Sequence, residues 1–151
     1  MQGKVVAIYT APAEGAPVEA RQSVRAVPGR GLEGDRYFAA ERRRQGQDVT
    51  VVAAETLAQA AAELGVVLGP NDHRRNIVVE GIDLAACVGG ILRLGEVEVE
   101  VVRVNQPCRY LQELAGKPLL KVLIDRAGVR GDIISEGTIA VGDPVVSGRR
   151  P

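Results

Sequence analysis

The segment 96–104, in which valine returns at nearly every second position, constrains the fold more than any other part of the sequence. Side chains two apart on a strand point to the same face, so this alternation predicts a β-strand with one buried side. Pro107 has no amide hydrogen for a strand ladder and therefore ends the pairing. Residues 109–115 read as a short helix that ends at Gly116. Cys108 therefore follows a strand held by the core and stands at the start of a helix.

This position makes Cys108 the candidate nucleophile or metal ligand of the chain. The first turn of a helix carries the positive end of the helix dipole, and Arg109 adds a cation. Both favour the thiolate, which is the nucleophilic and metal-binding form of cysteine. The alternative is that Cys108 is only a small buried side chain at a strand end. The second cysteine, Cys87, stands in an apolar turn and is interpreted as a core residue.

The remaining sequence predicts many short strands and few helices. A helix is expected over 55–64, where apolar residues share one face and Gly65 follows, and a helical turn over 83–87. Strands are expected over 5–9, 18–27, 48–53, 75–80, 91–94, 96–104, 121–125, 133–134, 138–141 and 143–146. Short strands separated by glycines favour a closed β-barrel or sandwich, mainly β with short peripheral helices, over a layered α/β sheet. Because no linker or repeat is visible, we expect a single domain over residues 1–151.

Composition limits the environment and the partners of the protein. The 19 basic and 19 acidic side chains balance, which argues against general nucleic-acid binding. Two cysteines 21 positions apart and a single histidine give no zinc-site spacing and a poor disulfide framework. No apolar run approaches the roughly 18 residues of a membrane span, and residues 1–6 lead straight into a strand. We therefore expect a cytoplasmic protein that is not exported and does not bind a membrane.

Residues 29–34 form a GxGxxG pattern, which is typical of a dinucleotide-binding loop when a strand precedes it and a helix follows. Pro28 breaks the preceding strand at the wrong place for that turn. Residues 35–44 carry charges on all sides, and the chain lacks repeating βαβ units. Turn glycines around an ion pair between Asp35 and Arg36 are the favoured interpretation, and the arginine run 42–44 is expected to be a solvated loop.

A second polar cluster, Arg74, Arg75 and Asn76, precedes the apolar residues 77–79. Two guanidinium groups and an amide at the mouth of a strand supply forked donors that suit a phosphate or a carboxylate. Taken alone, such a cluster is more often a solvated surface turn. The neighbouring His73 is expected to lie exposed in a loop.

Together, these segments resemble the MOSC domain, the family named for the C-terminal part of molybdenum cofactor sulfurase. The order and spacing of the motifs carry the resemblance, and each motif alone is modest. The matching segments are 31–36, 74–84, 92–95, 107–108, 127–131 and 137–143. No aminotransferase-like part or N-terminal barrel extension is visible, so the chain resembles a stand-alone member.

The resemblance implies a MOSC, or pyruvate-kinase-type, β-barrel with the cysteine at a cleft. Cys108 would be the persulfide carrier or the molybdenum ligand. The cofactor-binding residues would be Arg74, Arg75 and Asn76 at the pterin phosphate, with Arg109 beside the cysteine and Gly34, Asp35 and Arg36 on the opposite lip. Tyr37 stands where many members have histidine, which speaks against a proton-transfer role at that position.

Three function classes remain open from the sequence. The first is an enzyme in which Cys108 holds the molybdenum cofactor (molybdopterin) and small N-hydroxylated bases or amidoximes are reduced. The second is a sulfur carrier that receives sulfur from a cysteine desulfurase and serves a molybdoenzyme, with pyridoxal phosphate present only on the desulfurase. The third is a scaffold or binding module in which Cys108 merely packs. No lysine of the chain stands in a context that suggests a Schiff base.

Overall fold

The computed structural model describes residues 2–38, 45–107, 109–123 and 126–148. Within them, an eight-stranded sheet runs in the order β11-β7-β8-β9-β5-β6-β1-β2, and β11 also pairs with β1. All of these strands except β2 therefore form a closed barrel, which leaves no open edge in the ring. The barrel strands are β1 (Gln2–Thr10), β5 (Val49–Ala53), β6 (Ile77–Glu80), β7 (Ile91–Leu94), β8 (Val97–Val104), β9 (Val129–Ile133) and β11 (Pro144–Gly148).

The barrel core is built by the alternation that the sequence displays. Val97, Val99 and Val101 of β8 are buried, whereas Glu98 and Glu100 between them are partly exposed. Every pairing in the ring is antiparallel except that of β5 with β6, which is parallel. Because a parallel pair needs a long crossover, the chain between these two strands forms helices rather than a hairpin. The prediction of a mainly β, barrel-like fold is confirmed.

A second, three-stranded sheet, β10-β3-β4, adjoins the barrel. It consists of β3 (Ser23–Val27), β4 (Gly31–Leu32) and β10 (Gly137–Ala140). The predicted single strand over 18–27 is wrong, because the chain bends at Gln22 and β2 (Glu19–Arg21) joins the barrel sheet instead. The GxGxxG glycines lie in the β3–β4 hairpin and the turns after it, and no helix follows within residues 33–38. Gly29 and Gly34 are turn residues, as predicted, whereas Gly31 begins β4.

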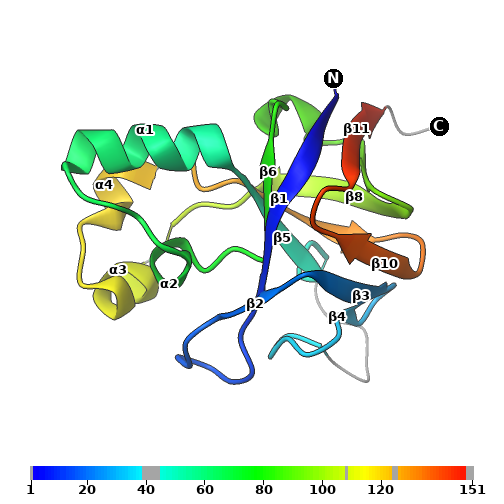
Figure 1. Cartoon of the computed structure of the whole chain (residues 1–151), viewed down its shortest axis with the longest axis horizontal. Coiled ribbons are helices and arrows are strands. Elements are labelled where there is room, and N and C mark those ends of the chain that lie inside the picture. Colours follow the sequence, from blue (N-terminus) through cyan, green and yellow to red (C-terminus); the bar gives the residue numbers. More distant parts are fainter. Residues whose placement is uncertain (1, 39–44, 108, 124–125, 149–151) are drawn as a thin grey trace.

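The helices gather on one side of the barrel (Figure 1). They are α1 (Ala54–Leu64), α2 (Pro70–His73), α3 (Arg109–Ala115) and α4 (Leu119–Leu123), with a 3₁₀ turn, η1 (Ala85–Cys87), between β6 and β7. Helix α1 ends at Gly65 in the left-handed conformation, φ 70°, as its sequence predicts. No helix of the described residues is long and apolar enough to span a membrane.

A small apolar cluster joins the helices to one another. Ala60 of α1, Leu111 of α3, and Leu119 and Leu123 of α4 are buried together. The predicted strand over 121–125 is therefore wrong within the described part, because Lys121 and Leu123 belong to α4. A short apolar run cannot be assigned to strand or buried helix from periodicity alone, and packing against α1 and α3 decides it here.

Candidate functional site

A cavity of about 310 Å³ lies against the outward-facing side of strands β5 and β9. Thr50 of β5 and Arg130 of β9 point away from the barrel core, because Val49, Val51 and Val129 beside them are buried. Loops and the start of α3 close the cavity from outside. Its lining residues are Tyr9, Ala11, Val18, Asp35, Arg36, Tyr37, Thr50, Arg74, Arg75, Asn76, Asn105, Gln106, Leu111 and Arg130. The volume is that of a site for a small organic ligand.

The charged groups of the cavity are mostly cationic. Among the described lining residues are four arginines, Arg36, Arg74, Arg75 and Arg130, and a single carboxylate, that of Asp35. Guanidinium groups present forked donors that match the oxygens of phosphates and carboxylates, and converging positive charge attracts anions. The cavity is therefore suited to an anionic ligand that carries oxygen acceptors.

Asp35 and Arg36 form one lip of the cavity. The buried Asp35 accepts a hydrogen bond from the Ala11 amide at 2.9 Å, and the Arg36 amide donates to the Ala11 carbonyl at 2.7 Å. The Arg36 guanidinium lies 4.3 Å from the centroid of the Tyr37 ring and also donates to the tyrosine hydroxyl. Among the described contacts, Asp35 thus holds the end of β1 rather than forming the expected ion pair with Arg36. Gly34 supports the turn at φ 87° and is not a lining residue.

Arg74 braces a loop at the rim of the cavity. Its guanidinium donates to the Ala16 carbonyl at 2.6 Å, and Val18 of the same loop donates to the Asn71 side chain at 2.8 Å. Arg74 ends α2 in the left-handed conformation at φ 55°, the single non-glycine residue of the described chain with positive φ. This conformation costs about 1–2 kcal/mol in an L-residue. The fold tolerates that strain at a cavity residue, which is where strained backbone commonly occurs.

Arg75 connects segments that are distant in the sequence. Its Nε donates to the Ala127 carbonyl at 3.0 Å, and Nη2 lies 3.5 Å from the carbonyl oxygens of Asn105 and Gln106. Its amide donates to Nδ1 of His73 at 2.8 Å. Arg75 therefore positions the segment 105–106, which directly precedes Pro107 and Cys108 in the chain.

The carboxamide of Asn76 is bonded within the protein. Its oxygen accepts hydrogen bonds from the Thr50 amide at 3.2 Å and the Thr50 hydroxyl at 3.0 Å. Its nitrogen donates to the Tyr9 carbonyl at 3.2 Å, and the Asn76 amide donates to the Thr50 hydroxyl at 2.9 Å. These bonds tie together β1, β5 and the entry to β6. Asn76 is a structural brace beneath the cavity, with at most one carboxamide hydrogen left for a ligand.

Asn105 is a cavity residue that the sequence reasoning missed. It follows β8 directly and is only 8% exposed, yet its carboxamide nitrogen has no hydrogen-bond partner among the described residues. A buried unpaired donor costs about 1–3 kcal/mol. The sequence did offer a signal, namely a polar residue at the end of the alternating strand and three positions before Cys108. Whether its side-chain carboxamide has a hydrogen-bond partner is not visible in the sequence.

His73 is buried and not exposed as expected. It ends α2 at 4% exposure, and its ring meets that of Tyr9 edge-on, with centroids 5.8 Å apart. Burial, and next the positive charge of Arg75, lower the His73 pKa to about 4, against a smaller opposing effect of Asp72. The imidazole is neutral at pH 7, which leaves its Nδ1 able to accept the Arg75 amide hydrogen.

The other predicted site residues either lie outside the described residues or do not line the cavity. Cys108 lies outside the described residues, as does the arginine run 42–44. Pro107 on its N-terminal side is buried, and Arg109 on its other side begins α3 with an exposed side chain that does not line the cavity.

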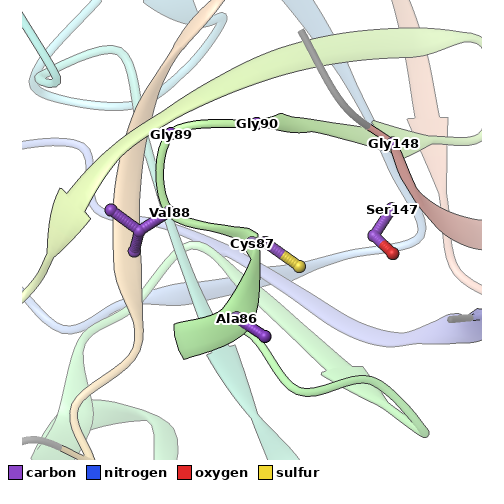
Figure 2. Close-up of a pocket in the computed structure, with 7 residues that line it drawn as sticks. All are labelled: Ala86, Cys87, Val88, Gly89, Gly90, Ser147 and Gly148. Atoms are coloured by element: carbon purple, nitrogen blue, oxygen red, sulfur yellow. The ribbon is translucent and has the colours of Figure 1, made fainter.

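Cys87 borders a separate, open depression (Figure 2). Figure 2 shows its sulfur pointing toward the Ser147 side chain, in surroundings of small residues that carry no charge. Sγ donates to the Asp83 carbonyl at 3.3 Å, and burial raises the pKa of this thiol. Cys87 belongs to the barrel core cluster, which confirms its interpretation as a core residue.

Comparison with known proteins identifies the fold family. A family model described as the MOSC domain matches residues 34–146, three quarters of the chain. The chain belongs to the MOSC domain family. The match includes β5, β6, β8 and β9, and with them every cavity residue except Tyr9, Ala11 and Val18. No curated protein matches this MOSC chain.

Solved structures show the same MOSC fold. The YuaD protein of Bacillus subtilis superposes with a TM-score of 0.83 at 17% identity, over 96% of this chain and 94% of that one. YiiM of Geobacillus stearothermophilus gives 0.73 at 18% identity, over 98% of this chain and 76% of that one. YiiM of Escherichia coli gives 0.70 at 18% identity, over 100% and 71%. Because these sequence identities are low, the three comparisons show a shared fold alone.

Proposed function

We propose that this MOSC protein binds the molybdenum cofactor through Cys108, with the pterin phosphate in the arginine-lined cavity. The observation that carries the proposal is the convergence of Arg36, Arg74, Arg75 and Arg130 on one cavity, which Gln106, two positions before Cys108, also lines. Membership of the MOSC family is consistent with a role related to the molybdenum cofactor.

The donor set of the cavity fits such a cofactor. The phosphate of a pterin cofactor needs forked cationic donors, which the arginines supply. Further acceptors of the ligand need neutral donors, such as the side-chain nitrogen of Asn105, which has no partner among the described residues. A cysteine thiolate is a soft ligand suited to molybdenum. When bound, the cofactor supplies the redox chemistry, whereas the residues of the chain bind and orient it. Reduction of small N-hydroxylated compounds is the activity we propose for the loaded protein.

A sulfur carrier is the second candidate, and the same cysteine supports it. A thiolate at Cys108 would attack the outer sulfur of a persulfide on a cysteine desulfurase, and the desulfurase thiolate would leave. The step moves one sulfur without net oxidation, and pyridoxal phosphate stays with the desulfurase. A molybdoenzyme would receive the sulfur. Either role needs a reduced thiol, so the compartment we propose is the cytoplasm.

Metal analysis with pterin fluorescence tests the first candidate. Wild type, Cys108→Ser and the matched control Cys87→Ser are purified from a host that makes the cofactor. We expect near-stoichiometric molybdenum and pterin in wild type and Cys87→Ser, and their loss from Cys108→Ser. Wild-type protein without either would contradict cofactor binding.

Mass spectrometry tests the second candidate. After incubation with a cysteine desulfurase and cysteine, a sulfur carrier gains the mass of one sulfur on Cys108, reversibly with a reductant. Cys87→Ser should gain the same mass, while Cys108→Ser should not. An unmodified wild-type protein in this assay contradicts the carrier function.

A further inference from the structure

Two asparagines line the cavity, and their carboxamides are in opposite situations. That of Asn76 is bonded to Thr50 and Tyr9 through both its oxygen and its nitrogen. That of Asn105 is equally buried, but its nitrogen finds no partner among the described residues. The fold thus uses one amide to join its strands and leaves the other with an unused donor.

The backbone of Asn105 is fixed on both sides. Its amide donates to the Gly128 carbonyl at 2.8 Å, and its carbonyl oxygen lies 3.5 Å from Nη2 of Arg75. Bonds to two different segments hold this residue at the end of β8. The Asn105 side chain is therefore carried by a fixed backbone. Binding a ligand then requires no entropy loss for ordering this part of the chain.

The charges around Asn105 indicate which atom its donor would meet. Arg75 contacts its carbonyl oxygen, and Arg130, two residues after Gly128, lines the same cavity. A ligand attracted by these cations carries negatively charged oxygens, and an oxygen acceptor is what a buried N–H group requires.

We propose that Asn105, rather than Asn76, donates a hydrogen bond to an oxyanion oxygen of the ligand in this cavity. The inference rests on the proposed function and deepens it, because it names the neutral donor and the chemical class, a phosphate-type oxyanion, that the donor recognises. It also assigns to Asn105 the ligand-binding role that the sequence motif alone suggests for Asn76.

If Asn105 donates to the ligand, removing its side chain affects stability and ligand binding in opposite directions. A buried donor without a partner destabilises the ligand-free protein, so its removal leaves the fold intact or stabilises it. The same removal weakens binding, because a hydrogen bond to a charged oxygen is lost. For Asn76 the reverse holds: removing its carboxamide breaks the bonds among β1, β5 and β6 and lowers stability.

Calorimetric titration of cofactor-free protein, purified from a host that does not make the cofactor, with inorganic phosphate tests the proposal, together with thermal unfolding in phosphate-free buffer. We expect Asn105→Ala to bind phosphate about tenfold more weakly, or worse, with a Tm equal to or above that of wild type. Asn105→Asp keeps the size but places a carboxylate against the oxyanion, so its loss of affinity at pH 7 should exceed that of Asn105→Ala. Asn76→Ala, the matched control, should show a Tm several degrees lower.

Three results would overturn the proposal: no saturable phosphate binding by wild type, unchanged affinity in Asn105→Ala, or a Tm of Asn105→Ala as low as that of Asn76→Ala. Pterin content, measured on the same variants purified from a host that makes the cofactor, separates this inference from the proposed function. Wild-type levels of pterin in Asn105→Ala contradict the Asn105 assignment and leave cofactor binding standing. Phosphate binding that depends on Asn105, in a protein without pterin, supports the assignment and contradicts cofactor binding.

Discussion

Thr50 of β5 lies directly opposite Arg130 of β9 in the antiparallel ladder, and both side chains line the cavity on the outside of the barrel wall. Toward β6, the other neighbour of β5, the Thr50 hydroxyl forms hydrogen bonds with the backbone amide and the side-chain oxygen of Asn76. One strand position thus connects the cationic lining of the cavity to the asparagine that holds β1, β5 and β6 together.

Replacing Thr50 with valine is expected to destabilise the protein by about 1–3 kcal/mol, because valine matches the shape but leaves the Asn76 amide and carboxamide without their hydroxyl partner. Urea unfolding of wild type and Thr50→Val measures the difference in the free energy of unfolding. Thr138→Val, at an exposed strand position, is the matched control and should lie within about 0.5 kcal/mol of wild type. Equal stability of the two variants would show that the hydrogen bonds between the Thr50 hydroxyl and Asn76 contribute nothing.

Gly128→Ala is expected to destabilise the protein more than Gly142→Ala does. Both glycines have positive φ, 91° and 94°, so alanine is strained at either position by about 1–2 kcal/mol. A Cβ at Gly128 would also collide with the backbone of Val51 and Val52, whereas none of the described atoms lies within 4 Å of one at Gly142. Denaturant unfolding of the two variants compares them directly. If Gly142→Ala costs as much as Gly128→Ala, close approach of β5 to this turn is not what requires glycine.

The single histidine should make stability depend on pH. The His73 pKa is about 4 in the folded protein, and 6.5 is its usual value when exposed. Between these values the unfolded chain binds a proton that the folded protein does not, so stability falls as the pH falls from 6.5 towards 4. The shift of the His73 pKa contributes on the order of 3 kcal/mol to the free energy of unfolding above pH 6.5, and this contribution is lost below pH 4.

Unfolding free energies of wild type and His73→Asn, measured from pH 7 to pH 4.5, test this dependence. Asparagine can still accept the Arg75 amide hydrogen but does not titrate. The wild type should lose stability relative to His73→Asn as the pH falls. Parallel pH curves for the two proteins would mean that His73 is exposed to water.

Cys87 should react slowly with alkylating agents in the folded protein, because burial raises its pKa and keeps the thiol protonated. Cys108→Ser leaves Cys87 as the sole thiol. Its iodoacetamide rate at pH 8 should be at least about tenfold lower in buffer than in urea. Similar rates in both conditions would contradict a core role for this cysteine.

Local pattern accounts for much of the fold. The alternation over 96–104 is reproduced as β8, and the apolar face of 55–64 as α1 with its glycine end. Where the pattern was short, it failed: residues around Lys121 and Leu123 were predicted as a strand and form α4. A short segment with a few apolar residues suits either element, and the neighbours that it packs against decide between them.

The cavity was predictable only in part. The motif Arg74-Arg75-Asn76 and the pair Asp35-Arg36 do meet at one cavity, as the resemblance to MOSC domains implied. Thr50 and Arg130 were not foreseen as cavity residues, since each stands in an ordinary strand context. Asn105 was missed although it follows the alternating strand three positions before Cys108. The burial of His73 was also not predicted, because one histidine in a polar stretch does not reveal that Tyr9 will cover it.

By itself, the sequence determined the longer periodic segments, such as β8 and α1, and the glycine turns that separate elements. These features depend on side-chain periodicity and backbone preference, which act between residues near in sequence. The order and spacing of its motifs also indicated the MOSC family. The tertiary structure alone decided which asparagine has its carboxamide bonded, that His73 is buried and which arginines share a cavity. Those outcomes depend on hydrogen bonds and contacts between residues 9, 50, 76, 105 and 130, whose distances from one another are set only when the barrel closes.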